Sequence, residues 1–215
     1  MLFLCIDVET SSIKPENGEL LSFAAVLEDT NNIRPVEELP FFYCVFRHDF
    51  IKGEPYALNM NKGLIQEISE GESENLIDLY EFNQLFNDFL FSSKVECHGG
   101  YDILAQMIKV DKNGNSTPVL HRSPKEKIKL KASGKNFGTF DKGWIESKIP
   151  NFNTYFQFNH RVLDVGSLMV DFKNDEWLPG LLECKKRAGI KGEVTHNALE
   201  DCWDVIEILR TKYER

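Results

Sequence analysis

The sequence of 215 residues lacks several features, and each absence excludes a class of protein. No apolar run approaches the roughly 20 residues that a membrane-spanning helix requires. The N-terminus has neither the basic region nor the small-residue cleavage site of a signal peptide. The five cysteines are odd in number and form no Cys-x-x-Cys pair, which indicates reduced, mostly buried thiols. We therefore expect a cytoplasmic protein that is not associated with a membrane.

An excess of positive charge is also missing. The net charge of −9 argues against a protein whose main role is to coat nucleic acid. It does not exclude an enzyme that meets phosphate groups through bound metal ions. Repeats and low-complexity segments are absent too, whereas phenylalanine is abundant, with 16 residues. This composition predicts a globular protein with a core rich in aromatic side chains.

The N-terminal segment predicts a buried strand that ends in two acids. Five apolar residues at positions 2–6 are typical of a strand covered on both faces. Asp7 and Glu9 follow without a turn and, being two residues apart on a strand, point to the same face, with Cα atoms roughly 6–7 Å apart. Two such carboxylates repel each other and lose hydration, which favours a hard divalent cation between them. A strand that simply runs out into solvent is the alternative interpretation.

The remaining pattern places strands early in the chain and helices late, which predicts a mixed α/β (α+β) class in one domain. Strands over 19–28 and 41–50 form an antiparallel meander with the first strand. Residues 94–108 begin like a strand, and about 105–126 form an inserted surface element such as a hairpin. A further half-buried strand is predicted at 127–132, and a loop at 151–160. Helices are predicted around 62–68, 75–91, 165–172 and 179–189, and from 197 onward.

The entry to the last helix carries a histidine and an aspartate. Asn197 and Glu200 fit a capping box, so the helix begins at 197. His196 then precedes the helix and Asp201 lies in its first full turn, which allows both side chains to face one cleft. The alternative is an exposed histidine next to an aspartate that the helix dipole favours.

A further acid has two candidates. Asp141 follows the strand at 127–132 and a glycine-bearing turn, and it stands where the next helix begins. Asp102 also follows a strand-like run, in the stretch His98-Gly99-Gly100-Tyr101-Asp102. Both positions lie near an expected sheet edge, and spacing alone leaves both open.

Taken together, Asp7-x-Glu9, a later Asp after an asparagine-containing turn, and His196-x4-Asp201 resemble the motifs of the DEDDh exonucleases. These are the DnaQ-like 3′–5′ exonucleases of the ribonuclease-H-like fold. The stretches at 134–141 and 160–165 resemble the oligoribonuclease and phage-type branches, which favours Asp141 over Asp102. The long segment from 95 to 127 departs from a compact member and keeps Asp102 as a candidate.

The resemblance implies a ribonuclease-H-like fold with a central mixed five-stranded sheet, an antiparallel three-stranded meander and flanking helices. It implies a single exonuclease domain over 1–215, with a surface insertion at about 105–126. Two divalent ions, Mg²⁺ or Mn²⁺, would be held by Asp7, Glu9, Asp141 and Asp201, with His196 as general base. Nucleoside 5′-monophosphates would be released from the 3′ end of single-stranded DNA or RNA. The family pattern suggests substrate contacts at Thr10, Asn136 and Phe140.

Other interpretations stay open at this point. A catalytically silent ribonuclease-H-like module that binds nucleic acid or protein is the main alternative. A two-metal phosphatase of small phosphoesters is another. A homodimer and docking to a larger replication, repair or RNA-processing partner are both compatible with the sequence. One strongly basic run either guides a phosphate backbone toward Asp141 or forms a solvated face: Arg122, Lys125, Lys127, Lys129, Lys131 and Lys135.

Overall fold

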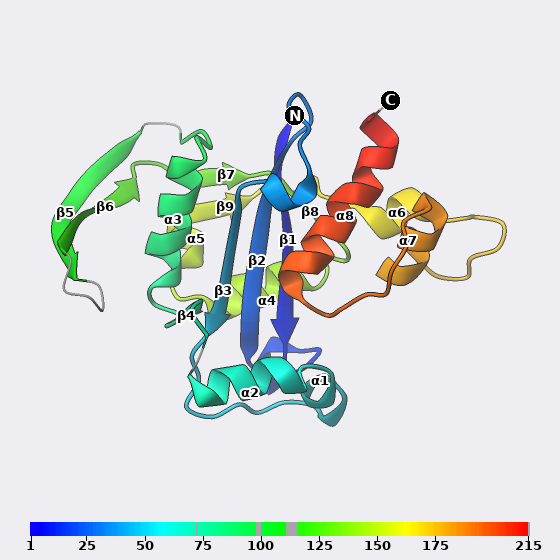
Figure 1. The fold of residues 1–215 in the computed structure, drawn as a ribbon, viewed down its shortest axis with the longest axis horizontal. Helices are drawn as coiled ribbons and strands as arrows, with labels where there is room; N and C mark the ends of the chain where they lie inside the picture. The colour runs from blue at the N-terminus through cyan, green and yellow to red at the C-terminus, as the bar shows by residue number, and fades with distance from the viewer. Residues whose placement is uncertain (72, 98–99, 111–115, 215) are drawn as a thin grey trace.

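The computed structural model describes residues 1–71, 73–97, 100–110 and 116–214, without the side chains of 104–110 and 116–121. Across these residues the frame is a mixed sheet of six strands in the order β10-β8-β1-β2-β3-β4 (Figure 1). β1 is antiparallel to β2 and β2 to β3, whereas the pairs β1–β8, β8–β10 and β3–β4 are parallel. The strands are β1 (Leu2–Thr10), β2 (Leu20–Asp29), β3 (Phe41–Phe46), β4 (Leu76–Ile77), β8 (Ala132–Gly134) and β10 (Leu163–Asp164).

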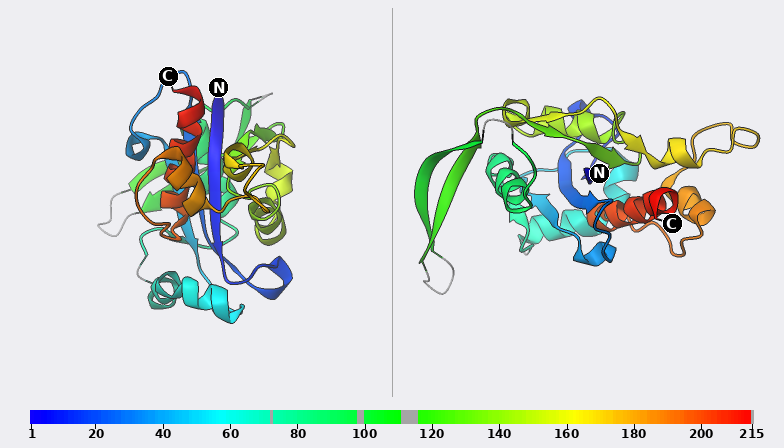
Figure 2. Two further views of the ribbon diagram at one scale, coloured as in Figure 1. Left: turned by 90° about the vertical axis from the view of Figure 1, so that its right-hand side faces the viewer. Right: turned by 90° about the horizontal axis from the view of Figure 1, so that it is seen from above.

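Helices cover both faces of this sheet because the central strands are apolar on both. Leu4 and Ile6 of β1 pack into one cluster, while Phe3 and Cys5 point to the opposite face. The first face is covered by α3 (Phe82–Ser92), α4 (Asp141–Lys148) and α5 (Phe152–Tyr155). The second is covered by α6 (Val165–Met169), α7 (Leu181–Ala188) and α8 (Ala198–Tyr213). Figure 2 shows β1 between these two layers.

Two small strand pairs and two more helices lie around this frame. β5 (Tyr101–Val110) and β6 (Ser116–Pro124) form an antiparallel pair at one side of the molecule (Figure 1). β7 (Ile128–Leu130) and β9 (Phe156–Phe158) pair in parallel. α1 (Pro55–Met60) and α2 (Lys62–Glu70) lie beyond the C-terminal end of β1, where the antiparallel β2 begins. The 3-10 turns are Pro15–Asn17 and Val36–Glu38.

The structure confirms the mixed α/β class, the antiparallel meander of β1–β3 and the aromatic core. The rings of Phe23 and Phe82 meet edge to face at 4.8 Å, and Phe86 lies 5.4 Å from Phe23. All three side chains are fully buried between the sheet and α3. Edge-to-face aromatic pairs of this kind add to the stabilisation that their buried area provides.

Several predicted boundaries were wrong, because tertiary pairing overrode local periodicity. The sheet has six described strands rather than five, since two-residue strands extend both edges. Residues 76–77 pair with β3 instead of starting a helix, so α3 begins only at 82. The strand predicted at 127–132 is divided between β7 and β8, which pair with different partners. The loop predicted at 151–160 contains α5 and β9.

Three more boundaries moved inward or outward for related reasons. The strand predicted to reach residue 50 ends at Phe46, and the helix predicted over 165–172 ends at Met169. Residues 94–97 are not a strand, because the extended run begins at Tyr101.

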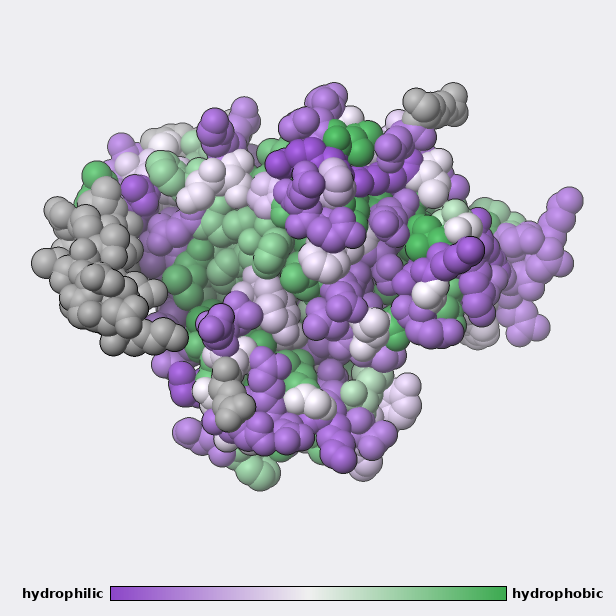
Figure 3. All heavy atoms as spheres, in the orientation of Figure 1, coloured by the Kyte–Doolittle hydropathy of each residue, from purple (hydrophilic) through white to green (hydrophobic). Residues whose placement is uncertain are grey.

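In the described residues, every helix is too short or too polar to cross a bilayer. Figure 3 shows that the viewed face is hydrophilic over α8 and α2 and apolar between α3 and α8.

Candidate functional site

The end of β1 presents two carboxylates on one face of the sheet. Asp7 and Glu9 lie on the same side of the strand as Phe3 and Cys5, which is the side that α8 covers. Asp7 is half-buried and Glu9 is buried, with 6% of its surface exposed. The predicted placement of the two acids on a common face is therefore what the strand geometry produces.

The neighbouring strand ends early and leaves room for a third acid. β8 stops at Gly134, so the amide of Val8 further along β1 has no strand partner on that side. This amide donates to Asp141 Oδ1 at 3.1 Å. A Cβ at position 134 would lie 2.8 Å from the carbonyl oxygen of Ile6, so only glycine permits this close approach of β8 to β1.

A tight turn carries the chain from β8 to Asp141. Asn136 adopts a left-handed conformation with φ of 63°, and its backbone N–H donates to Asp164 Oδ2 at 2.7 Å. Its carbonyl oxygen accepts from the amides of Thr139 and Phe140, both at 2.9 Å. α4 then begins at Asp141, whose carboxylate gains from the positive end of the helix dipole.

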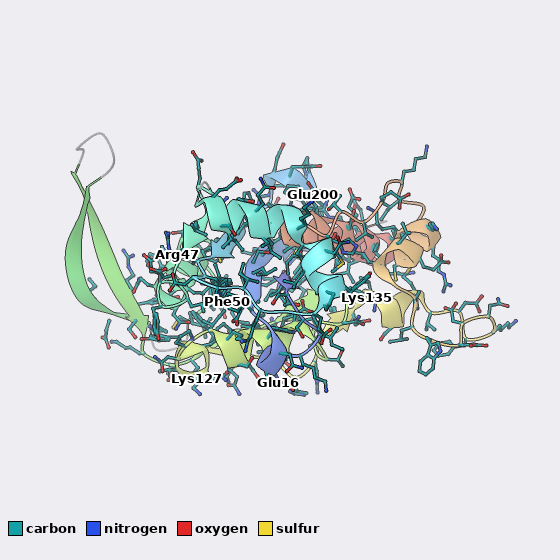
Figure 4. The ribbon with its side chains drawn as sticks, turned by 90° about the horizontal axis from the view of Figure 1, so that it is seen from below. Glu16, Arg47, Phe50, Lys127, Lys135 and Glu200 are labelled. Atoms are coloured by element: carbon teal, nitrogen blue, oxygen red, sulfur yellow. The ribbon has the colours of Figure 1, made fainter. Side chains whose placement is uncertain are left out.

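The fourth acid and the histidine enter from α8. Asn197 caps this helix, because its Oδ1 accepts from the amides of Leu199 at 3.0 Å and Glu200 at 3.3 Å. His196 precedes the cap, is exposed and has a φ of 55°. One potential ligand atom each from Glu9, His196 and Asp201 lie within 4.8 Å of one another. Figure 4 looks onto this end of the molecule, with Glu200 of α8 labelled.

Burial and the neighbouring acids disfavour ionisation of the two carboxylates on β1. Burial, followed by the charges of Asp141, Glu9 and Asp201, raises the pKa of Asp7 well above its usual range. Burial and the charge of Asp201 raise the pKa of Glu9 to about 8, which a hydrogen bond from Asn61 partly opposes. These shifts identify a place where negative charge is costly unless a cation neutralises it.

The pKa values of Asp141 and Asp201 are also raised, chiefly by burial. Burial raises the pKa of Asp141 to about 7, although its hydrogen bonds from backbone amides act in the other direction. Burial and the neighbouring Asp204 also raise the pKa of Asp201 to about 7. Oδ1 of Asp201 is buried and has no hydrogen-bond partner in the described part of the chain. A set of carboxylate oxygens with one such atom unpaired fits a hard divalent cation.

The other predicted site residues are placed differently. The hydroxyl of Thr10 donates to the carbonyl oxygen of Ser12 at 2.8 Å, and Thr10 is buried. Phe140 is half-buried, with its ring 6.3 Å from that of Trp144. Asp102 lies in β5 at the side of the molecule, exposed and 3.5 Å from Lys125 Nζ. Asp141, and not Asp102, therefore meets Asp7 and Glu9; residues 98–99 of the rival stretch lie outside the described residues.

Two polar groups near the acids escaped the sequence analysis. The buried side chain of Asn61, between α1 and α2, donates from Nδ2 to the carbonyl oxygen of Thr10 at 3.1 Å. Lys185 of α7 is 4% exposed; its Nζ lies 2.6 Å from Asp204 Oδ2 and 3.1 Å from the carbonyl oxygen of Glu193. Lys185 thereby ties the segment before His196 to α8. In the sequence, Lys185 is one of three consecutive basic residues and nothing distinguishes it from the other two. Asn61 belongs to no recognisable sequence motif.

A pocket of about 240 Å³ adjoins the acids on the side of α2. Its polar lining includes Glu9, Tyr43, Asn61, Glu67 and His196. The pocket therefore reaches from Glu9, one of the predicted cation ligands, to His196, the predicted general base, with room for a small polar group.

The described sheet, its antiparallel meander and its two helical layers define a ribonuclease-H-like α/β fold. E. coli exonuclease I has this fold. Its zinc-bound complex with single-stranded DNA superposes with a TM-score of 0.54 and 17% identity, covering 100% of this chain and 41% of that chain. Its complex with a dA16 oligonucleotide gives 0.55 and 19%, covering 98% and 41%. An apo structure of exonuclease I gives a TM-score of 0.56 and 16% identity, covering 100% of this chain and 42% of that chain.

At this identity the likeness concerns the fold, and this chain spans about two-fifths of the length of exonuclease I. No family model matches the sequence, and no curated protein matches it.

Proposed function

We propose that this chain is a metal-dependent 3′–5′ exonuclease that hydrolyses phosphodiester bonds at the 3′ end of single-stranded nucleic acid and releases nucleoside 5′-monophosphates. The observation that carries the proposal is the convergence of buried acids from β1, α4 and α8 beside an exposed histidine. The complexes of exonuclease I with single-stranded DNA support DNA as the first substrate to test. The single domain over 1–215, with its insertion at about 105–126, belongs to the same proposal.

Asp7, Glu9, Asp141 and Asp201 would hold two divalent ions, Mg²⁺ or Mn²⁺. When bound, such ions neutralise the acids and stabilise negative charge that develops on the phosphate oxygens. The raised pKa values of Glu9 and Asp141 support this assignment, because burial outweighs the opposing effect of Lys135 on Asp141 among the described residues.

His196 would accept the proton of the attacking water. The residue is exposed, and it lies on a left-handed turn immediately before the helix that carries Asp201. A neutral imidazole can accept a proton at its unprotonated ring nitrogen. The pocket beside Glu9 would receive the terminal nucleoside. Thr10, Asn136 and Phe140 are the substrate contacts proposed from the sequence, and they lie outside the lining of this pocket.

Digestion of 5′-labelled single-stranded DNA and RNA, with Mg²⁺, with Mn²⁺ and with EDTA, tests the proposal. We expect a ladder that shortens from the 3′ end and requires the metal. Asp7→Ala should abolish it, and His196→Ala should slow it roughly 10²- to 10⁴-fold. Asp102→Ala is the matched control, because this exposed acid lies away from the cluster, and its rate should equal the wild-type rate.

The faster of the two strands would define the sugar preference. If neither strand shortens with either metal, while the chain remains folded, the exonuclease proposal is wrong. Binding of the strands without hydrolysis would then favour the catalytically silent module.

A further inference from the structure

The fold disperses the basic run that the sequence presents as one stripe. Lys125 lies 3.5 Å from Asp102, and the guanidinium of Arg122 stacks 4.3 Å from the centre of the Phe91 ring. The exposed Lys129 belongs to β7, which pairs with β9 outside the central sheet. Lys135 is the member of the run that follows the end of β8, on the approach to Asp141.

Two glycines leave the space that the Lys135 region occupies. Gly134 allows β8 to approach β1, as described above. At Gly166 in α6, a Cβ would lie 3.1 Å from both Cε and Nζ of Lys135, so the absence of a side chain leaves the path for the lysine open. Nζ donates to Oδ1 of Asn136, the next residue. Figure 4 labels Lys135 at this end of the molecule.

The ammonium group is anchored without a direct ion pair, although Asp164 lies close by: a Cβ at Gly166 would lie 3.1 Å from both Lys135 Nζ and Asp164 Oδ1. Its hydrogen bond uses one of three N–H donors, and the acceptor is an uncharged amide. No acid of the described chain forms an ion pair with Lys135 within 4.0 Å, while its charge lowers the pKa of Asp141. A cation with unused donors therefore lies within electrostatic range of the acid on α4, whereas His196 is associated with Glu9 and Asp201.

We infer that Lys135 binds a non-bridging phosphate oxygen of the strand that occupies the acidic cluster, with Asn136 orienting its ammonium group. The inference rests on the proposed function. A strand whose 3′ end enters a cluster of four acids needs positive charge for its phosphates, and lysine supplies a compact charge with three donors. Lys135 is a substrate contact in this inference, and it is distinct from the four acids and from His196.

The test is binding rather than hydrolysis. A 5′-fluorescein-labelled oligothymidylate is titrated with wild-type chain in EDTA at about pH 6, where part of the acidic cluster is protonated. Fluorescence anisotropy is measured between roughly 50 and 200 mM salt. For Lys135→Met we expect a roughly tenfold weaker affinity at low salt. We also expect the slope of log K against log salt to fall by about 0.7, the value for one phosphate contact on a single strand.

Matched variants separate the contact from a general effect of charge. Lys135→Arg should retain most of the slope, and Lys135→Gln should behave like Lys135→Met. Lys129→Met removes the same charge from the same run at a remote position, and it should bind as the wild type does. An equal loss in Lys129→Met and Lys135→Met would overturn the inference.

A methylphosphonate linkage removes the contact from the side of the ligand. One such linkage is moved stepwise along the 3′ end of the oligonucleotide. At one position it should weaken binding to the wild type but leave binding to Lys135→Met unchanged. The reason is that the methylphosphonate and the substitution delete the same contact. Additive effects at every position would overturn the inference. If the wild type neither binds nor shortens any strand, the proposed function fails as well; if it binds and Lys135→Met has the same slope, only the role of Lys135 is wrong.

Discussion

The acidic cluster makes the stability of the metal-free chain depend on pH, and Asp201 allows this dependence to be predicted. Burial, and then the charge of Asp204, raise its pKa from 3.8 to about 7. Between these values the folded state keeps a proton that the unfolded state has lost. Stability from this group is therefore highest below pH 4 and is lost as the pH rises toward and through 7.

The size of the effect follows from the same values. At about 1.36 kcal/mol per pKa unit, the difference between 3.8 and about 7 corresponds to about 4 kcal/mol as an upper bound. For 215 residues with an unfolding entropy of about 2.1 cal/mol/K per residue, this lowers Tm by roughly 9 °C. Asp201→Asn removes the charge, and it also relieves Glu9, whose pKa the same charge raises.

The assay is thermal unfolding in EDTA at about pH 5 and about pH 8. The Tm of the wild type should fall between these values by several degrees more than that of Asp201→Asn. Asp102→Asn is the control, because its carboxylate is exposed and paired with Lys125, and its profile should follow the wild type. Mg²⁺ should raise the Tm of the wild type more at about pH 8 than at about pH 5, and it should have little effect on Asp201→Asn.

One result would refute the reasoning. If Asp201→Asn and the wild type lose the same amount of stability between the two pH values, the negative charge of Asp201 is not costly in the folded chain. The cluster would then provide no electrostatic reason for binding a cation.

Two further predictions concern stability away from the cluster. Arg210→Met should lower the free energy of unfolding by about 3–5 kcal/mol in urea denaturation, because it leaves the fully buried Glu28 unpaired; the present contact is 2.6 Å. Adding Glu28→Gln should recover part of this loss, and an additive further loss would contradict the role of the ion pair. Asn197→Ala should cost about 1 kcal/mol, because the cap of α8 is lost, whereas Asn197→Asp should retain it. Equal stability of the alanine and aspartate variants would show that the cap contributes nothing.

Where the pattern was local, prediction from the sequence succeeded. Residues at positions i and i+2 of a strand share a face, so Asp7 and Glu9 lie on one side of β1. The asparagine that begins α8 caps it as the sequence suggested. Predicted element boundaries were wrong where pairing with a distant segment set them. Residues 76–77, for example, pair with β3 instead of starting the predicted helix.

The choice between Asp102 and Asp141 was of the second kind. Both follow strand-like stretches, and a resemblance of motifs favoured Asp141. The deciding contact joins Asp141 to the amide of Val8, 133 residues earlier in the chain. No local propensity encodes a contact at this separation.

The sequence by itself therefore determined the mixed α/β class, the buried first strand with its acids and the histidine before a capped helix, because hydrophobic period and capping chemistry act over a few residues. Only the tertiary structure decided which acids meet and that Lys185 ties α7 to α8. It also separated Lys135 from the rest of the basic run. The physical reason is that these arrangements depend on where strands of one sheet end and which partners they find, and pairing between distant segments is set by the packing of the whole core.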